Sequence, residues 1–470
     1  MSVFMKKTFE TCLLAFLLPV FLHGQEVGLL RMNPEHRDSK TQAAIWGGVE
    51  QGWFRPSYAP TFGWSAGARA QGVRHGENTS WMGSVSFEQK TGYNMLSSMF
   101  LEPGYFPVDL LESTPGTKSR ETGRLEAGFL TDMGYEWAAG LKASFQGAYA
   151  GKRTDLRHTT FGMDLQVEPT VTFVMDDDMG LASSYVFRLR TESLKTQSPG
   201  ADGTLPVFLD MGMRYGAFQD RAGVFPVREM SHGFSERFFS EDVSAGLDWM
   251  WKRGQAGGGG FDHFRFPGST VSVFYEQIFQ ADATDHWLRL AYQRQRDQLR
   301  QTASDNAGFT SLSGRLGRSV ELKYEARFLH GAVKSLGVAL EGRRFVDHAW
   351  VPMQDLTKRN LGTALMSAAF AFGNLDLKMD ALIGGGLWRD RGRSVSESED
   401  MPYRRTKDWL RDMDYQIAPR FGAGGSIAYH FTRGQGLFLQ VDGQWCHALR
   451  MAASGGRSRG TGTLTIGYDF

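Results

Sequence analysis

The feature that most constrains this 470-residue chain is a series of long segments in which apolar and polar residues alternate one by one. In residues 136–149 every second side chain is apolar, and residues 161–173 and 319–328 repeat the pattern. A period of two predicts β-strands with one apolar face. Runs of about ten to fourteen residues are roughly twice the usual globular strand, but they suit a tilted strand that crosses a bilayer. Further segments of this kind are 243–251, 375–383, 417–431 and 437–445.

The last ten residues, TGTLTIGYDF, alternate in the same way and end on an aromatic side chain. Their apolar face consists of Leu464, Ile466, Tyr468 and Phe470. This is the form of the closing strand of an outer-membrane β-barrel, with an aromatic residue near one membrane interface. Tyr468 and Phe470 are therefore predicted to act as an assembly signal, which resembles the C-terminal signal that the barrel-assembly machinery reads.

The other end of the chain has the pattern of a secretory signal peptide. Lys6 and Lys7 precede the apolar run CLLAFLLPVFL, which is too short for a spanning helix. We expect export by the Sec pathway with cleavage after Gly24, so that residues 1–24 are removed and residues 25–470 form a single barrel domain. Cys446 is then the only cysteine, and it is predicted to be a small packed side chain on an inward face.

Composition agrees with a barrel and excludes some other classes. No stretch after residue 24 has the length and apolarity of a membrane helix, whereas barrel strands escape such a test because only alternate residues face lipid. Aromatic residues make up 13% of the chain and glycine occurs 57 times, which fits aromatic girdles and turns. The 52 basic residues balance 51 acidic ones, so no nucleic-acid partner is expected.

The lengths of the connections predict the topology. Short turns alternate with longer loops, as in up-and-down outer-membrane barrels, where the short turns are periplasmic. The chain is therefore predicted to be all-β, a transmembrane antiparallel barrel of about 14 to 18 strands, with 18 as the best count. The segment 218–241 breaks the alternation: either it is a long periplasmic connection, or a strand pair is missed or wrongly assigned there, which is why the count has a range. Short turns are predicted near 132–134, 175–180, 280–285, 330–334, 373–374 and 432–436, and longer loops near 90–120, 192–205, 253–268, 298–317, 347–361, 388–415 and 449–460.

The stretch LEAGFLTDMGYEWAAGLKASFQGAYAGKRTDLRHTTFGMDLQVEPTVTF, residues 125–173, is similar to an uncharacterised family of outer-membrane barrels from Bacteroidota, and the likeness extends over the mature chain. The resemblance implies a single Gram-negative outer-membrane barrel, commonly encoded beside a TonB-dependent transporter. It implies no catalytic residue.

The polar faces carry charges of both signs and are predicted to line the lumen. A lumen with mixed charges favours cross-strand ion pairs and weak ion selectivity. The predicted function is transport-related, as an accessory partner of a TonB-dependent uptake system or as a weakly selective, porin-like channel. The predicted lumen residues are Glu136, Lys142, Asp164, Glu168, Arg188, Arg190, Glu321, Lys323, Glu325, Arg327, Asp376, Lys378 and Asp380.

An alternative hypothesis is a surface hydrolase that uses histidine–carboxylate pairs in extracellular loops, where a carboxylate orients the ring that takes a proton from water. Chance neighbours in polar loops explain the same pattern. The candidate residues are Asp155, His158, Asp262, His263, Asp347 and His348.

Three other polar or flexible segments have simpler interpretations. A basic cluster at the rim either contacts lipopolysaccharide phosphates or is a solvated loop. The three aspartates at 176–178 lack the spacing of a calcium loop, and the glycine-rich run at 254–260 lacks the Lys-Ser/Thr of a phosphate loop. Neither a metal nor an organic cofactor is predicted, and the expected surroundings are outer-membrane lipid and lipopolysaccharide. The basic cluster consists of Lys152, Arg153, Arg157 and His158.

Overall fold

The computed structural model describes most of the chain from residue 40 onward. The described ranges are 40–134, 136–154, 156–176, 179–197, 207–219, 223–258, 261–281, 283–302, 309–352, 354–390, 405–432, 434–450 and 456–470. The predicted signal peptide, residues 1–24, lies outside the described residues.

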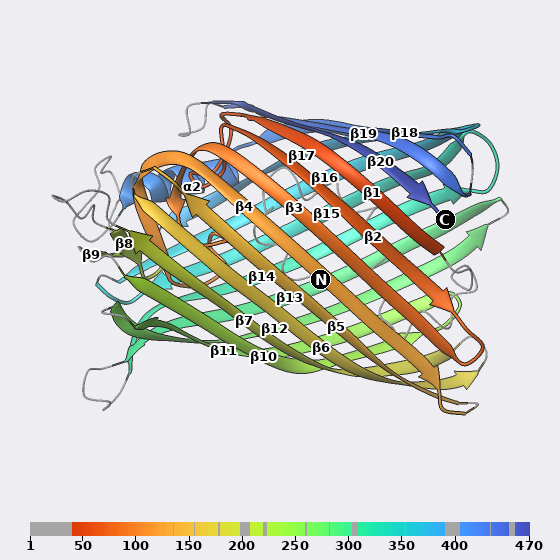
Figure 1. Ribbon diagram of the computed structural model, residues 1–470, viewed down its shortest axis with the longest axis horizontal. Helices are drawn as coiled ribbons and strands as arrows, with labels where there is room; N and C mark the ends of the chain where they lie inside the picture. Colours follow the sequence, from red (N-terminus) through yellow and green to blue (C-terminus); the bar gives the residue numbers. More distant parts are fainter. Residues whose placement is uncertain are drawn as a thin grey trace.

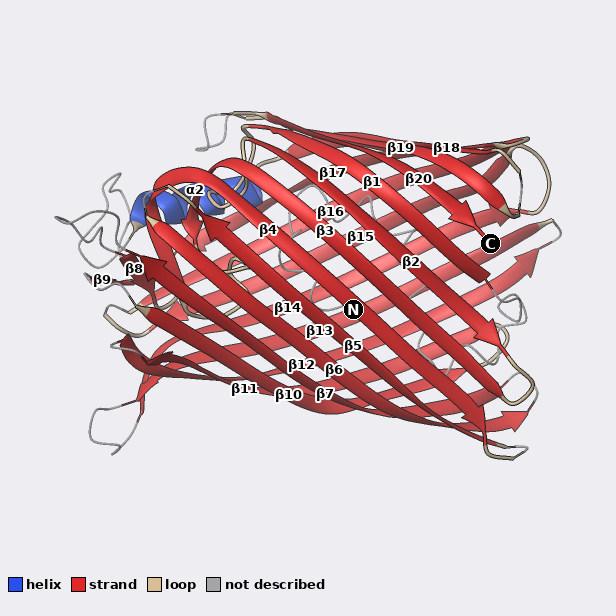
Figure 2. Cartoon of the chain, in the orientation of Figure 1, coloured by secondary structure: helices blue, strands red, loops and turns tan. Residues whose placement is uncertain are grey.

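Eighteen of the twenty strands in the described ranges close into one antiparallel barrel (Figures 1 and 2). Each strand pairs with the next one in sequence, β7 pairs with β10, and β20 pairs with β1 to close the ring. The wall strands are β1 (Lys40–Gly52), β2 (Phe62–His75), β3 (Thr79–Ser98), β4 (Asp109–Asp132), β5 (Trp137–Lys152), β6 (Arg157–Asp176), β7 (Met179–Gln197), β10 (Val224–Phe239), β11 (Val243–Gly258), β12 (Phe261–Ala281), β13 (Thr284–Thr302), β14 (Phe309–Phe328), β15 (Val333–Ala349), β16 (Asp355–Phe372), β17 (Leu375–Asp390), β18 (Arg420–His430), β19 (Gly436–Ala448) and β20 (Ser458–Asp469).

The predicted fold class and the count of 18 strands are confirmed. Short turns join the strands at one end of the barrel, which we call the turn end. The first residue of β1 and the last residue of β20 also lie there. Longer connections lie at the opposite end, the loop end. They include the hairpin of β8 (Val207–Asp210) and β9 (Gly216–Gln219) and the helix α2 (Thr406–Ile417), which Figure 1 shows at the end away from the C-terminus.

Two predicted boundaries were wrong. Within 218–241 the alternative of a long periplasmic connection is wrong, because residues 224–239 form the wall strand β10 and the long connection before it belongs to the loop end. The predicted strand 417–431 begins only at Arg420, because Ile417 is the last residue of α2.

Several predicted loops are also shorter than expected. The segments 253–268, 298–317 and 347–361 are largely strand, since β11 to β16 continue well past their exposed apolar residues. In 253–268 the sequence pattern ends early because the inner face of β12 is apolar there, at Phe264 and Phe266. Apolar residues on the inner face interrupt the alternation that identifies a half-buried strand.

The outer face of the barrel is an apolar belt. On the closing strand, Leu464, Ile466, Tyr468 and Phe470 expose 47%, 41%, 44% and 60% of their surface, so that the predicted apolar face points outward. A continuous ring of such residues matches the lipid-facing band of a transmembrane barrel. No helix among the described residues has the length and apolarity needed to cross a membrane.

Candidate functional site

Four segments fold inward at the loop end and contact one another. We call them the mouth layer: residues 53–61 between β1 and β2, residues 99–112 between β3 and the body of β4, the β8–β9 hairpin (207–219), and α2. The start of β4 pairs with β8, where Leu110 lies opposite Leu209. The layer therefore adds a second structure inside the barrel wall.

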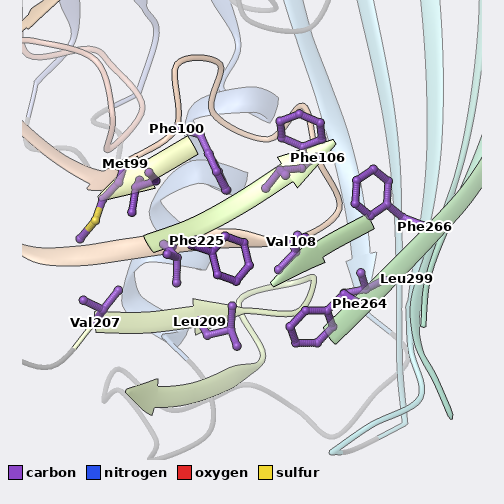
Figure 3. Packing of buried hydrophobic residues seen from close by; sticks show 14 of the residues in the cluster. Met99, Phe100, Phe106, Val108, Val207, Leu209, Phe225, Phe264, Phe266 and Leu299 are labelled. Carbon is purple, nitrogen blue, oxygen red and sulfur yellow. The ribbon is translucent and has the colours of Figure 1, made fainter. Parts of the chain in front are cut away.

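An apolar core attaches one side of the mouth layer to the wall. Phe100, Phe106 and Val108 of the inserted segment pack with wall residues that face inward (Figure 3). Phe106 lies 5.7 Å from Phe266 between ring centroids, and Phe100 lies 6.2 Å from Phe225. Several of these residues are fully buried, and burial of a large apolar side chain stabilises a fold by about 1.5–3 kcal/mol. The wall contributes Leu194, Phe225, Val227, Ala256, Phe264, Phe266, Leu299 and Leu312.

A smaller apolar cluster attaches the opposite side. Phe54 is fully buried, and its ring centroid lies 4.7 Å from that of Tyr415 in α2. Cys446 and Ala448 of β19 complete this cluster together with Ala418. Cys446 is 4% exposed, so the prediction of a packed, inward thiol side chain is confirmed.

Arg214, in the turn of the β8–β9 hairpin, links the two sides. Its Nη2 donates to Asp412 Oδ2 of α2 at 2.7 Å, and its Nη1 donates to Asp210 Oδ2 at 3.2 Å. Met213 and Arg214 both have positive φ, 55° and 62°, which costs on the order of 1–3 kcal/mol each in non-glycine residues. The surrounding contacts hold this strained turn in place.

Further hydrogen bonds connect the segments of the layer. Arg405 donates its backbone N–H to the carbonyl of Arg214 at 3.0 Å and its Nη1 to the carbonyl of Glu112 at 2.9 Å. Ser57 donates its backbone N–H to Asp412 Oδ1 at 3.0 Å. All four segments are thus joined through polar contacts as well as through apolar packing.

Other buried charges fix residues 99–112 to the wall. Glu112 is fully buried and forms ion pairs with Lys118, at 2.6 Å, and with Lys152. Arg190 of β7 pairs with Glu102 at 2.9 Å, and its guanidinium lies 4.0 Å from the centroid of the Tyr105 ring. Buried ion pairs of this kind are costly to break, because the remaining charge has no solvent to stabilise it.

The electrostatics of the hairpin turn are set by three carboxylates. Burial by itself would lower the pKa of Arg214, but Asp412, Asp210 and Asp109 outweigh it and raise that pKa above its usual value. Burial raises the pKa of Asp109 to about 7, against the opposing effects of Arg214 and of the hydrogen bond from Ser98. Burial also raises the pKa of Asp210. Asp109 belongs to the mouth layer, before β4 begins to pair with β5 at Lys118.

The raised pKa of Asp109 makes the mouth layer sensitive to pH. The unfolded carboxyl titrates near pH 4, so its contribution to stability is complete below about pH 4 and is lost as the pH rises to about 7. We expect backbone hydrogen exchange in residues 99–112, corrected for the intrinsic rate, to increase as the pH rises through this window. The variant Asp109→Asn has no carboxyl group to ionise at this position, so it should remove most of this slope of exchange against pH. Each unit of pKa shift corresponds to about 1.4 kcal/mol of stability.

The matched control is Asp414→Asn, which removes a carboxylate of α2 that pairs at 2.6 Å with the half-exposed Arg450, just after β19. This variant should keep the slope of the wild type. If exchange depended on pH equally in the wild type and in Asp109→Asn, Asp109 would not be the group that makes the mouth layer sensitive to pH.

The predicted lumen residues lie on the wall as follows. Most are on the strand face opposite the apolar belt, and several form ion pairs, such as Lys142 with Glu126 across strands at 3.2 Å. Arg188 pairs with Asp164 across β6 and β7. Other pairs join residues two apart on one strand, which the prediction of cross-strand pairs missed: Glu321 with Lys323, Glu325 with Arg327, and Asp380 with Lys378.

Four predicted lumen residues need separate description. Glu136 is exposed in the turn before β5 and does not lie on a wall strand. Arg190 is buried beneath the mouth layer. Glu168 lies opposite Lys142 in the strand register, and Asp376 pairs with His430 at the turn end, at 3.3 Å.

Two of the three histidine–carboxylate pairs of the hydrolase hypothesis do not come together. Asp262 and His263 lie on β12, and Asp347 and His348 lie on β15, not in loops as predicted. Neighbouring residues on a strand point to opposite faces, so neither pair can share a proton. Asp347 instead accepts hydrogen bonds from Arg315, at 2.6 Å, and from Arg359. Asp155 lies outside the described residues.

The predicted basic cluster is also divided. Lys152 is buried against Glu112, and His158 is 2% exposed at the start of β6, so neither is available at the rim. Arg153 and Arg157 are exposed. Asp177 and Asp178 lie outside the described residues, and no group of three or more metal-ligating side chains is present within the described ranges.

The mouth layer was not predicted from the sequence. Its key residues are Arg214, Asp412 and Arg405; they carry no motif, and Arg214 lies 198 residues from Asp412. One signal was present: the apolar residues of 99–111, MFLEPGYFPVDLL, do not alternate, which is unusual for a solvated loop.

Comparison with known proteins adds a family and a set of distant structures. The FrpB iron transporter from Neisseria meningitidis (F5-1 variant) has a TM-score of 0.49 and 8% identity, over 92% of this chain and 83% of that chain. The outer membrane transporter YddB from Escherichia coli has a TM-score of 0.43 and 7% identity, over 91% and 80%. The ferric citrate transporter FecA has a TM-score of 0.42 and 7% identity, over 92% and 79%.

No curated protein matches the sequence. One family profile does match, over residues 31–470, and it describes a family of unknown function. The family is uncharacterised, as the resemblance in the sequence implied, while a Bacteroidota origin and a neighbouring transporter gene remain predictions. Since the match covers nearly the whole chain, the protein belongs to the family of unknown function DUF6850.

Proposed function

We propose that this protein is an outer-membrane β-barrel with a transport-related role, closed at its extracellular end by the mouth layer and opened by a partner. The apolar belt supports a membrane location, and the short turns at the end that holds the C-terminus support a periplasmic turn end. We further propose Sec export with removal of residues 1–24, and insertion by the barrel-assembly machinery through Tyr468 and Phe470.

The mouth layer is the observation that carries this proposal. Its segments pack against two opposite regions of the inner wall. Arg214 and Arg405 join these segments across the loop end. A permanently open pore does not need an apolar core and buried ion pairs inside its entrance. Closure that depends on one strained, charged turn suits a barrel whose opening is controlled.

The partner that we propose is a TonB-dependent uptake system, in which this barrel is an accessory component. The second candidate is a weakly selective channel, which the mixed charges of the inner face favour, because ion pairs of both signs line the wall. The structure offers no assembled pair for the hydrolase alternative in its described ranges.

Purification from native membranes separates the two candidates. The full chain, with an affinity tag inserted in the connection between β7 and β8, is extracted in mild detergent, and the proteins that co-purify with it are identified by mass spectrometry. An accessory barrel should co-purify in a fixed ratio with a larger outer-membrane transporter. Recovery of the barrel alone, together with steady conductance in planar bilayers, would favour the stand-alone channel.

A further inference from the structure

The outer wall carries a row of basic side chains at the loop-end border of the apolar belt. Arg294, Arg318 and Arg344 lie directly opposite one another on the neighbouring strands β13, β14 and β15. We call them the arginine row. All three are exposed, and they lie on the same strand face as the exposed residues Leu290, Val320 and Leu340.

Two more outward bases, Lys358 and Arg389, lie opposite each other on β16 and β17, two residues nearer the loop end than Asn360, which faces Arg344. The outward positions of β13 to β17 hold no aspartate or glutamate. None of the five bases has an ion-pair partner among the residues that the structure describes. Like charges directly opposite on neighbouring strands repel, so the row is unfavourable unless an anion binds to it.

An apolar groove begins directly below the arginine row, on the side of the turn end. Gly342, Gly362 and Gly385 lie in register across β15, β16 and β17, which leaves three adjacent outward positions without side chains. The groove has a volume of about 640 Å³ and is lined by Val320, Leu322, Leu340, Ala364 and Ile383 together with these glycines. A Cβ atom at Gly342 or Gly362 would meet no atom within 4 Å.

The arginine row lies nearer the loop end and the apolar groove nearer the turn end, which is the order of the headgroup and the acyl chains of an outer-leaflet lipid. The arginine row lies two residues beyond Val320 and Gly342 along their strands, so the charged head of a molecule in the groove would reach it. Guanidinium groups bind phosphate through paired hydrogen bonds. A charged side chain on the lipid face is costly at the centre of the bilayer and tolerated near its interfaces, which fits the border position of the row.

We propose that the outer face of β13 to β17 is a binding site for a phosphorylated, acylated lipid of the outer leaflet. The arginine row binds its phosphate groups, and one acyl chain occupies the glycine groove. The proposal concerns the outer wall and stands independently of what the mouth layer admits. It also differs from the predicted rim cluster, of which Lys152 and His158 are buried.

Binding can be measured with the purified full chain in nanodiscs of phosphatidylcholine, with a fluorescent diphosphorylated lipid A as the probe. The triple variant Arg294→Gln, Arg318→Gln, Arg344→Gln should bind at least about tenfold more weakly, since three charge-assisted contacts are lost. The corresponding triple Lys variant keeps the charge but lacks the paired hydrogen-bond geometry of arginine. Its affinity should lie between that of the wild type and that of the Gln variant. Heat-modifiable migration on gels shows that each barrel is folded.

The groove has its own test and matched control. Gly342→Leu with Gly362→Leu fills the groove and should weaken binding, whereas Gly123→Leu with Gly443→Leu adds the same side chains elsewhere on the outer wall, where a Cβ also meets no atom within 4 Å. The control should bind like the wild type.

Three results would overturn the proposal. One is unchanged binding by the Gln triple variant, and another is equal binding of dephosphorylated lipid A. The third is inorganic phosphate that binds as tightly as the lipid, because the site would then recognise an ion without its acyl chain. Equal weakening in both leucine pairs would remove the groove from the site.

Discussion

Replacement of Arg214 by alanine should turn a silent barrel into one that conducts ions. The change leaves Asp412 and Asp210 without their shared cation inside the mouth layer, and breaking a buried ion pair from one side costs roughly 3–5 kcal/mol. It also removes the bridge between the β8–β9 hairpin and α2. We expect frequent openings in planar bilayers and faster hydrogen exchange in residues 405–417, with weak selectivity between small cations and anions because charges of both signs line the wall.

Arg450→Ala is the matched control for this experiment. Arg450 also pairs with an aspartate of α2, Asp414, but it is half exposed, and exposed ion pairs contribute little. The control should stay silent. If Arg214→Ala were equally silent and its exchange unchanged, the hairpin turn would not hold the layer closed. Strong selectivity for one ionic sign would contradict the description of the inner face.

Loss of Phe470 should reduce the amount of assembled barrel by roughly tenfold, the effect of about 1.4 kcal/mol on an equilibrium. Phe470 donates its backbone N–H to the carbonyl of Thr41 at 2.9 Å, across the seam where β20 meets β1, and its ring lies 4.7 Å from that of Tyr468. Deletion removes both contacts. Phe470→Lys keeps the backbone contact but places a charge where 60% of an apolar side chain is exposed on the belt.

Heat-modifiable barrel in isolated outer membranes is the quantity to compare. Phe470→Tyr should assemble normally, since it keeps the aromatic ring. Leu449→Lys is a matched control, because Leu449 is 61% exposed, just beyond the end of β19 and away from the seam. Normal membrane levels of the Phe470 deletion would show that the terminal residue is not part of an assembly signal.

The wall of this barrel is predictable from sequence because its rule is local. In residues 319–328 the alternation predicts whether each side chain faces the lumen or the outside. The structure places Val320, Leu322 and Tyr324 outward as predicted. The short turns follow for the same reason. The rule fails where both faces are apolar or buried, as at Phe225 and Val227, which explains why β10 was missed as a strand.

The mouth layer follows no local rule. Arg214 and Asp412 are 198 residues apart, and Ser57 and Asp412 are 355 apart, so the contact exists only once the barrel brings its loops together. The helix α2 has no capping side chain that would mark its start. Two of the histidine–carboxylate pairs failed for a related reason: adjacency in sequence was taken as proximity, although successive residues of a strand, such as Asp347 and His348, point to opposite faces.

Conductance of the unmodified full chain in planar lipid bilayers at neutral pH tests the central claim most directly. The claim is that the mouth layer, held by Arg214 between Asp210 and Asp412, closes the loop end of the barrel. The account predicts a silent barrel at low voltage that becomes conducting in Arg214→Ala. Steady, weakly selective conductance by the unmodified chain would contradict it and would identify a constantly open channel.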